Sequence, residues 1–180
     1  MAQHSLSIPL KNRPWDRLFI AFFALNFLFI CPIVDMEQLT VLDPTRMEEN
    51  GYPAWPPAPL IDLVHWYGFT FDPALIARPP WWQATIWIDM FFFWPFYGFA
   101  IYAFWKGRNW IRLGAIVWAS VMLTNVTIIM YEEVFGPYAS PHLWNVVAAN
   151  LAWIVMPILT LWRMGKSVYP FSGEVGVPPA

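Results

Sequence analysis

Residues 82–105 read WQATIWIDMFFFWPFYGFAIYAFW, and this run decides the fold class. A helix needs roughly 20 apolar residues to cross a bilayer core of about 30 Å, so the run is long enough to span a membrane. Asp89 is its one charged side chain. A charge at membrane depth is costly unless it is paired or faces a cavity, which makes Asp89 a candidate functional residue.

Three further apolar stretches lie at about residues 16–35, 110–131 and 143–164. Hydrophobic residues make up 58% of the 180-residue chain and charged residues 12%, which disfavours a water-soluble fold. Asn26 and Pro32 interrupt the first stretch, and no small-residue cleavage site follows it, so we interpret it as a helix rather than a signal peptide. The pattern predicts an all-α membrane protein, a bundle of four transmembrane helices.

Basic residues gather in the N-terminal tail, in the loop between the second and third helices and at the C-terminal end. They are Lys11, Arg13, Arg17, Lys106, Arg108, Arg112, Arg163 and Lys166. These segments share one side of a membrane only if four helices cross it, and the positive-inside rule then places both termini in the cytoplasm. We expect a cytoplasmic tail at 1–15, a four-helix domain at 16–170 and a flexible tail at 171–180. The membrane would be the endoplasmic reticulum in a eukaryote or the inner membrane in a bacterium.

The opposite side receives most of the acidic residues, in a long segment from 36 to 81 and a short loop around 132–142. Trp-Pro clusters in the long segment predict an ordered lid against the headgroups. The net charge of −2 gives no reason to expect nucleic acid as a partner. His65 and His142 have no partners at metal-ligand spacing, so we expect neither a metal ion nor another cofactor.

Several polar residues are predicted to share one depth in the bundle. Asp89, Asn125 and Asn150 each lie about seven residues from the outer end of a helix, which corresponds to roughly 10 Å below the interface. Asp35 closes the first helix, and Glu132 lies at the end of the third. The simplest account is an internal ligand cavity with aromatic walls and a few carboxylates and amides. The alternative is that these residues only bond to one another and hold the helices together.

The order and spacing of several short motifs resemble a known family. The stretches DPAL at 72–75, PPWW at 79–82 and YAFWKG at 102–107 resemble the sigma-2 receptor branch, and NLAWIVMP at 150–157 resembles the emopamil-binding protein, a sterol Δ8-Δ7 isomerase. Both branches belong to the EXPERA domain family. The resemblance implies four-helix membrane proteins that handle sterols, bind cationic amphiphilic drugs and can form homodimers.

The same resemblance implies roles for individual residues. Asp89 matches an acidic residue that both branches carry on the second helix. Asn125 falls where the isomerase has an Asp, and Glu132 falls where it has a Glu. Asn150 and Trp153 match the pair that flanks the sterol in the isomerase.

Other matches point to the receptor branch. Asp35 or Glu37 matches the acid that ends its first helix, and Asp72 matches an Asp in the loop before its second helix. Sterol isomerases place a His and a Glu one turn apart on the first helix, whereas Asn26 and Ile30 are the nearest substitutes in this chain. This departure counts against the isomerase proton relay.

Our main hypothesis is an isomerase that acts on a sterol or another polycyclic isoprenoid. Asp89 would protonate an alkene, Glu132 or Asp35 would carry the second proton, and the Trp153 ring would stabilise the carbocation. The predicted substrate-binding residues are Asn125, Asn150, Trp153, Asp72, Glu37 and Phe93. Two alternatives remain open: a non-catalytic protein that binds sterols or cationic amphiphiles, and a cyclase or hydrolase that protonates an isoprenoid epoxide or alkene.

Overall fold

The computed structural model describes residues 7–172, and within this range the regular secondary structure is helical apart from a single antiparallel bridge between Ser7 and Ser172. Four helical segments are long and apolar enough to cross a membrane: Asp16–Thr40, Pro80–Lys106, Ile111–Phe135 and Leu143–Gly165. The predicted fold class is therefore confirmed at this level. The first and third segments extend further toward the acidic end than the hydropathy pattern predicts.

The first span consists of α1 (Asp16–Leu25), a π-helical segment η2 (Asn26–Asp35) and α2 (Met36–Thr40). The second span consists of α6 (Pro80–Ile88), a π-helical segment η4 (Asp89–Phe93) and α7 (Trp94–Lys106). The third and fourth are α8 (Ile111–Phe135) and α9 (Leu143–Gly165). Shorter helices are η1 (Leu10–Asn12), η3 (Pro44–Arg46), α3 (Met47–Asn50), α4 (Ala58–Phe71) and α5 (Pro73–Ala77).

The two spans with π-helical segments also carry prolines there. Pro32 lies inside η2, and Pro95 lies in the first turn of α7, directly after η4. In a π-helix the N–H of residue 32 would donate to the carbonyl of Phe27, five residues earlier, but proline has no N–H to donate. The indole of Trp94 donates to that carbonyl instead, with an N–O distance of 3.0 Å. A side chain of the second span thus satisfies a backbone group that the first span leaves free.

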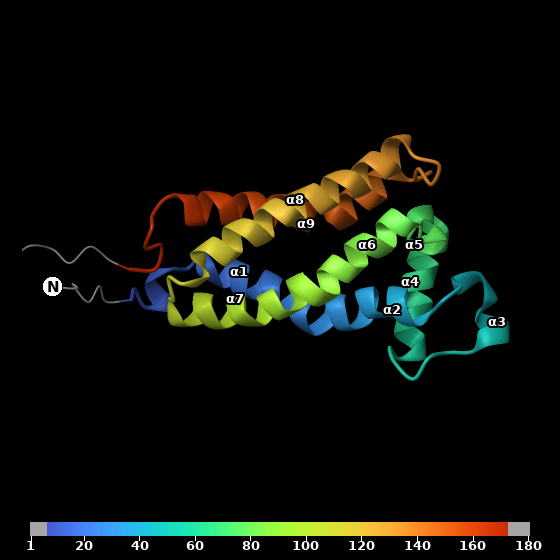
Figure 1. Cartoon of the computed structure of the whole chain (residues 1–180), viewed down its shortest axis with the longest axis horizontal. Coiled ribbons are helices and arrows are strands. Elements are labelled where there is room, and N and C mark those ends of the chain that lie inside the picture. The colour runs from blue at the N-terminus through green and yellow to red at the C-terminus, as the bar shows by residue number, and fades with distance from the viewer. Residues whose placement is uncertain (1–6, 173–180) are drawn as a thin grey trace, which may run out of the picture.

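The spans form two packed pairs. α8 packs along α9, and α1 packs along α7; the pairs lie close together near the described chain ends and separate toward α4 (Figure 1). Where they are close, an aromatic core joins them. Trp118 of α8 is fully buried and contacts Phe23 of α1, 5.3 Å between ring centroids, and stacks on Phe96 of α7 at 5.5 Å.

An ion cluster closes this end of the bundle, which we call the basic end. Arg13 and Arg163 both bind the buried carboxylate of Asp16, and Arg163 Nε lies 3.0 Å from Asp16 Oδ1. Arg13 also donates to the carbonyl of Phe104, with a distance of 3.0 Å. Both guanidinium groups lie over the ring of Phe171, 5.0 and 5.2 Å from its centroid. The contacts join the first span to α7, α9 and the chain after α9.

Phe171 belongs to the segment that was expected to be a flexible tail, yet its side chain is fully buried. Its position follows from these contacts with the two arginines and from a ring contact with Phe104 at 5.1 Å. The other residues of that predicted segment, apart from Ser172, lie outside the described residues, as do residues 1–6 of the predicted N-terminal tail.

The other end of the bundle is covered by the segment between the first and second spans, where α4 crosses the opening (Figure 1). A buried ion cluster fixes this cover. The carboxylate of Glu37 lies 2.5 Å from Arg78 Nη2 and 2.7 Å from His65 Nε2. Glu37 thereby joins α2 to α4 and to the turn before α6. The predicted lid is thus helical and held by ion pairs.

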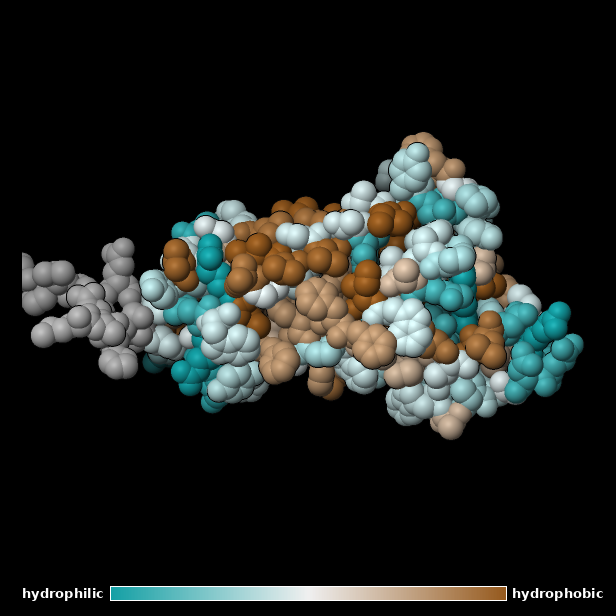
Figure 2. Space-filling view, viewed as in Figure 1, coloured by the Kyte–Doolittle hydropathy of each residue, from teal (hydrophilic) through white to brown (hydrophobic). Residues whose placement is uncertain are grey.

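The surface fits a bilayer. Figure 2 shows apolar side chains over the middle of one face and hydrophilic side chains toward both ends. Large aromatic residues on the spans are exposed, among them Phe91, Phe99 and Trp162. Exposed aromatic and aliphatic side chains between two polar ends are typical of a helical membrane protein.

Candidate functional site

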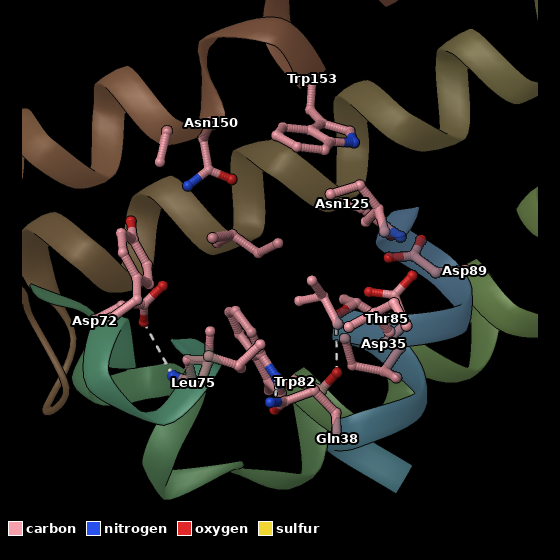
Figure 3. Close-up of a pocket in the computed structure, with 18 of the residues that line it drawn as sticks. Asp35, Gln38, Asp72, Leu75, Trp82, Thr85, Asp89, Asn125, Asn150 and Trp153 are labelled. Atoms are coloured by element: carbon pink, nitrogen blue, oxygen red, sulfur yellow. Dashed lines mark hydrogen bonds between the residues drawn. The ribbon is translucent and has the colours of Figure 1, made fainter. Parts of the chain in front are cut away.

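A pocket of about 270 Å³ lies where the helix pairs separate. Its walls come from η2, α2, α4, α5, α6, η4, α8 and α9, and most of the lining is apolar. The polar side chains that line it are Asp35, Gln38, Tyr67, Asp72, Trp82, Thr85, Asp89, Asn125, Asn150 and Trp153. Figure 3 shows ten of the lining side chains labelled, with Asp35 and Asp89 on one side and Asp72 on the other.

We define the inner pole of the pocket as Asp35, Asp89 and Asn125. Asp35 is the last residue of η2 and Asp89 is the first residue of η4, so both acids sit at the edge of a π-helical segment. The amide of Asn125, on α8, is directed toward the carboxylate of Asp89 (Figure 3). Widened π turns are common at functional sites because they redirect side chains. Here they bring two carboxyl groups into one apolar pocket.

The inner pole is short of hydrogen-bond partners. Within residues 7–172, Asp35 Oδ2, Asp89 Oδ1 and Asn125 Nδ2 are buried and have no partner at hydrogen-bond distance. No salt bridge reaches Asp35 or Asp89 from a basic side chain of the described chain. Leaving a buried polar atom without a partner costs about 1–3 kcal/mol, and more for a charged group. A ligand that supplies a donor to the two carboxyl oxygens would reduce this cost.

We define the outer pole as Tyr67 of α4, Asp72 at the start of α5 and Glu133 of α8. Asp72 Oδ1 accepts a hydrogen bond from the backbone N–H of Leu75, 3.0 Å away, and so caps α5. Burial raises the pKa of Asp72 above its ordinary value of 3.8, against the opposing effect of that cap. Burial, followed by the charges of Asp72 and Glu133, raises the pKa of Tyr67 to about 12. The phenol therefore keeps its proton at neutral pH.

Asn150 and Trp153 lie on one face of α9 and line the pocket between the two poles. Asn150 Nδ2 donates to the carbonyl of Val146 at 3.0 Å, which leaves its amide oxygen available to the pocket. The indole N–H of Trp153 donates to Asn26 Oδ1 at 2.9 Å, so Asn26 fixes the orientation of the ring. Asn26 thus holds a wall of the pocket in place at the position where isomerases were expected to carry a proton-transferring His.

Three residues of the predicted site do not line the pocket. Glu132 Oε1 accepts a hydrogen bond from the backbone N–H of Tyr138 at 2.9 Å and so holds the turn after α8. Glu37 is fully buried in the ion cluster of the lid. Phe93 is fully buried in the aromatic core, where it contacts Trp118 at 6.3 Å between ring centroids. The structure brings the other six predicted residues together around one pocket.

The pocket also contains polar residues that were not predicted. Gln38 accepts from the indole of Trp82 at 3.0 Å, and Thr85 donates to the Trp82 carbonyl at 2.8 Å (Figure 3). Tyr67, which lines the pocket, and Glu133, which lies against Asp72 but does not line the pocket, were also missed. The spacing of Thr85 and Asp89, one helical turn apart on the second span, could have indicated Thr85. Tyr67 lies in a segment without transmembrane character, and no sequence signal pointed to it.

The arrangement suits two kinds of chemistry. A carboxylate at the inner pole can accept a hydrogen bond from a hydroxyl or an ammonium group, and a carboxylic acid there can donate a proton to an alkene. Within residues 7–172, no three His, Cys, Asp or Glu side chains are grouped to hold a metal ion. The fold and the site together define the class: a four-helix membrane protein with a mostly apolar pocket that carries buried carboxyl groups.

Comparison with known proteins narrows this class to a family. Residues 59–164 match the model of the EXPERA family, the EXPanded EBP superfamily, and the chain belongs to this family. It is 31% identical over 123 residues to Sigma intracellular receptor 2 of Xenopus tropicalis, an alignment that covers 62% of this chain and 72% of the relative. The proteins of the same name from Macaca fascicularis and Homo sapiens are 31% identical over 85 residues, which cover 46% of this chain and 48% of theirs. The family predicted from the motifs is confirmed.

Proposed function

We propose that this protein binds a sterol-like molecule or a cationic amphiphile in its pocket and holds the polar head of the ligand at the inner pole. The observation that carries the proposal is the pair of carboxyl groups of Asp35 and Asp89, each with a buried oxygen that has no hydrogen-bond partner within the described residues. The names of the relatives, which are receptors, support binding over catalysis.

The rest of the pocket supports an apolar ligand body. Apolar side chains such as Ile33, Val64 and Met122 provide most of its walls. Burying apolar ligand surface contributes about 25 cal/mol per Å², and a hydrogen bond to a charged group about 1.5–3 kcal/mol. A ligand with one donor head and a polycyclic or long aliphatic body gains from both, while a fully polar molecule would lose its hydration without compensation.

A binding measurement tests the proposal. The purified protein in mild detergent would be titrated with a radiolabelled cationic amphiphile and a fluorescent sterol. We expect Asp35→Asn and Asp89→Asn to weaken binding at least about tenfold, which corresponds to the loss of one charged hydrogen bond. Glu48→Gln, at an exposed acid on α3, is the matched control and should leave binding unchanged. Equal affinities of all four proteins would contradict the proposal.

The second candidate function is double-bond isomerisation, favoured by one specific observation. The two carboxyl groups of the inner pole and the ring of Trp153 line the same pocket, which supplies an acid and an aromatic face for a carbocation. Protonation of the alkene by Asp89 would form a C–H bond, and loss of a neighbouring proton to Asp35 would form the shifted double bond. Incubation with sterols in deuterated water tests this function: deuterium in a rearranged product, absent with Asp89→Asn, would establish it.

We further propose that the basic end faces the cytoplasm. The turn between α7 and α8 and the described chain ends lie together at this end, and the connection between α8 and α9 lies at the other (Figure 1). The predicted cytoplasmic basic residues flank these segments, in line with the positive-inside rule. Cysteine substitutions at Lys11 and Ala139, labelled with a membrane-impermeant reagent on intact vesicles, should react from opposite sides.

A further inference from the structure

We propose that the natural ligand of the pocket is two-headed: an elongated apolar molecule with a hydroxyl or ammonium donor at each end, the second of which binds at the outer pole. The inference rests on the proposed function, which assigns the first head to the inner pole. It adds a second polar site and restricts the ligand to diols, diamines and amino alcohols with an apolar body.

The position of the outer pole supports a second head. Asp72 and Tyr67 line the same pocket as Asp35 and Asp89, and Figure 3 shows Asp72 on the side of the pocket opposite to Asp35 and Asp89. Leu75, Trp82, Ile129 and Ala149 are among the other residues that line this pocket. A ligand that fills the pocket along this direction places one end against each group of acids.

The outer pole contains buried polar atoms without a partner among the described residues, as the inner pole does. Both carboxylate oxygens of Glu133 and the hydroxyl of Tyr67 are buried without a hydrogen-bond partner within the described part of the chain. Glu133 is only 1% exposed and Asp72 only 3% exposed. These are two adjacent acids from different elements, α8 and the start of α5, and the cap on Leu75 occupies only one oxygen of Asp72.

Nearby basic side chains do not supply the missing donor. Arg78 and His65 both bind Glu37 in the lid, and no ion pair joins a basic side chain to Asp72 or Glu133 among residues 7–172. His142 lies against the ring of Phe71, 5.6 Å between ring centroids. The outer pole is therefore an acidic site without its own cation, and an ammonium or hydroxyl group of a ligand complements it.

A purely structural role explains less of this arrangement. An Asn or Ser could cap α5 as well as Asp72 does, without burying a carboxyl group. The Glu133 carboxyl group has no partner at hydrogen-bond distance within the described residues, in contrast to that of Glu132, which holds the turn after α8. Burying an acid without a partner is costly, and a ligand donor offsets that cost.

The test compares ligands that differ only in the second head. Androstanol and androstanediol share one steroid body, and dodecylamine and diaminododecane share one aliphatic chain. Each would be titrated against the purified wild-type protein in competition with a bound fluorescent sterol. We expect the two-headed member of at least one pair to bind at least about tenfold more tightly, as one additional hydrogen bond to a charged group predicts. This comparison needs no variant and is therefore independent of any folding defect.

Variants then assign the gain to the outer pole. Asp72→Asn keeps the cap on α5, and Glu133→Gln keeps the side-chain shape. Each should reduce the affinity advantage of the two-headed ligand over the one-headed ligand. Glu132→Gln, at the neighbouring acid whose carboxylate holds the turn after α8, is the matched control and should keep the full advantage.

The outcomes separate the two proposals. If the one-headed ligands bind in an Asp35-dependent manner but the second head adds nothing in either pair, the two-headed ligand is excluded and the proposed function stands. If no ligand binds, or if binding is insensitive to Asp35→Asn, the proposed function itself fails. An advantage that persists in Glu133→Gln and Asp72→Asn would place the second head elsewhere and overturn the inference.

Discussion

The two ends of this bundle treat buried acids in opposite ways. At the basic end, the carboxylate of Asp16 is bound by Arg13 and Arg163, and the surrounding aromatic rings fill the space between the helices. At the pocket end, Asp35 is buried and Asp89 is half-buried with one buried carboxyl oxygen, yet within the described residues no basic side chain reaches either of them. A satisfied acid stabilises the fold, whereas an unsatisfied acid indicates a site that a ligand completes. The contrast separates structural acids from candidate functional ones.

The largest effect should come from breaking the basic end. Asp16→Asn removes the shared negative charge and leaves the buried guanidinium of Arg13, as well as that of Arg163, without its counter-ion. Removing one partner of a buried ion pair typically costs about 3–5 kcal/mol. We expect a large fall in the thermal unfolding midpoint in detergent. A midpoint within error of the wild-type value would show that the two ends do not differ in the way proposed.

The same substitution at the pocket end should have a different consequence. Asp89→Asn removes a carboxyl group that no basic side chain balances, so the midpoint should stay unchanged or rise. Binding of a cationic amphiphile should fall at least about tenfold. Thermal unfolding and a ligand titration on one preparation would measure both. A fall in stability comparable to that of Asp16→Asn would mean that Asp89 has a structural role.

A smaller effect tests the link between the spans. Trp94→Phe removes the indole donor to the Phe27 carbonyl and keeps an aromatic ring, so we expect a loss of about 1 kcal/mol. Trp87→Phe, at a half-exposed Trp of the same span, is the control. If both variants unfold at the same temperature, the carbonyl has found another donor, and the π segment does not depend on Trp94.

The smallest effect concerns pH at the outer pole. Because burial raises the pKa of Asp72 above 3.8, the folded state holds this proton more strongly than the unfolded state does. The resulting stability is fully present below the unfolded pKa and is lost as pH rises through the folded pKa. Asp72→Asn cannot titrate, so its unfolding midpoint should fall less than that of the wild type between about pH 4 and neutral pH. Parallel curves for the two proteins would exclude this contribution.

Several features could be predicted from local sequence. The four spans follow from the length and composition of apolar runs, because the bilayer fixes both. Asp35, Asp89 and Asn125 could be singled out because polar residues in such runs are expensive and few. The family followed from the order of its motifs, since DPAL, PPWW and NLAWIVMP lie at matching places along the chain.

Other features depend on contacts between distant segments. Glu37 and Asp35 lie two residues apart, but one is paired with Arg78 and His65 in the lid and the other lines the pocket. Glu132 and Glu133 differ in the same way, since the first holds a turn and the second belongs to the outer pole. Neighbouring acids were therefore indistinguishable in sequence and separable only by their surroundings.

The sequence by itself determined that this chain forms four apolar helices with a few costly polar groups inside them. It did so because hydropathy and helix length are local properties of each segment. Tertiary structure decided which acids are satisfied, through the arginines that reach Asp16 and Glu37 from other parts of the chain. It also decided where the helices separate to leave a pocket, because cavity shape and hydrogen-bond partners depend on how segments far apart in sequence pack together.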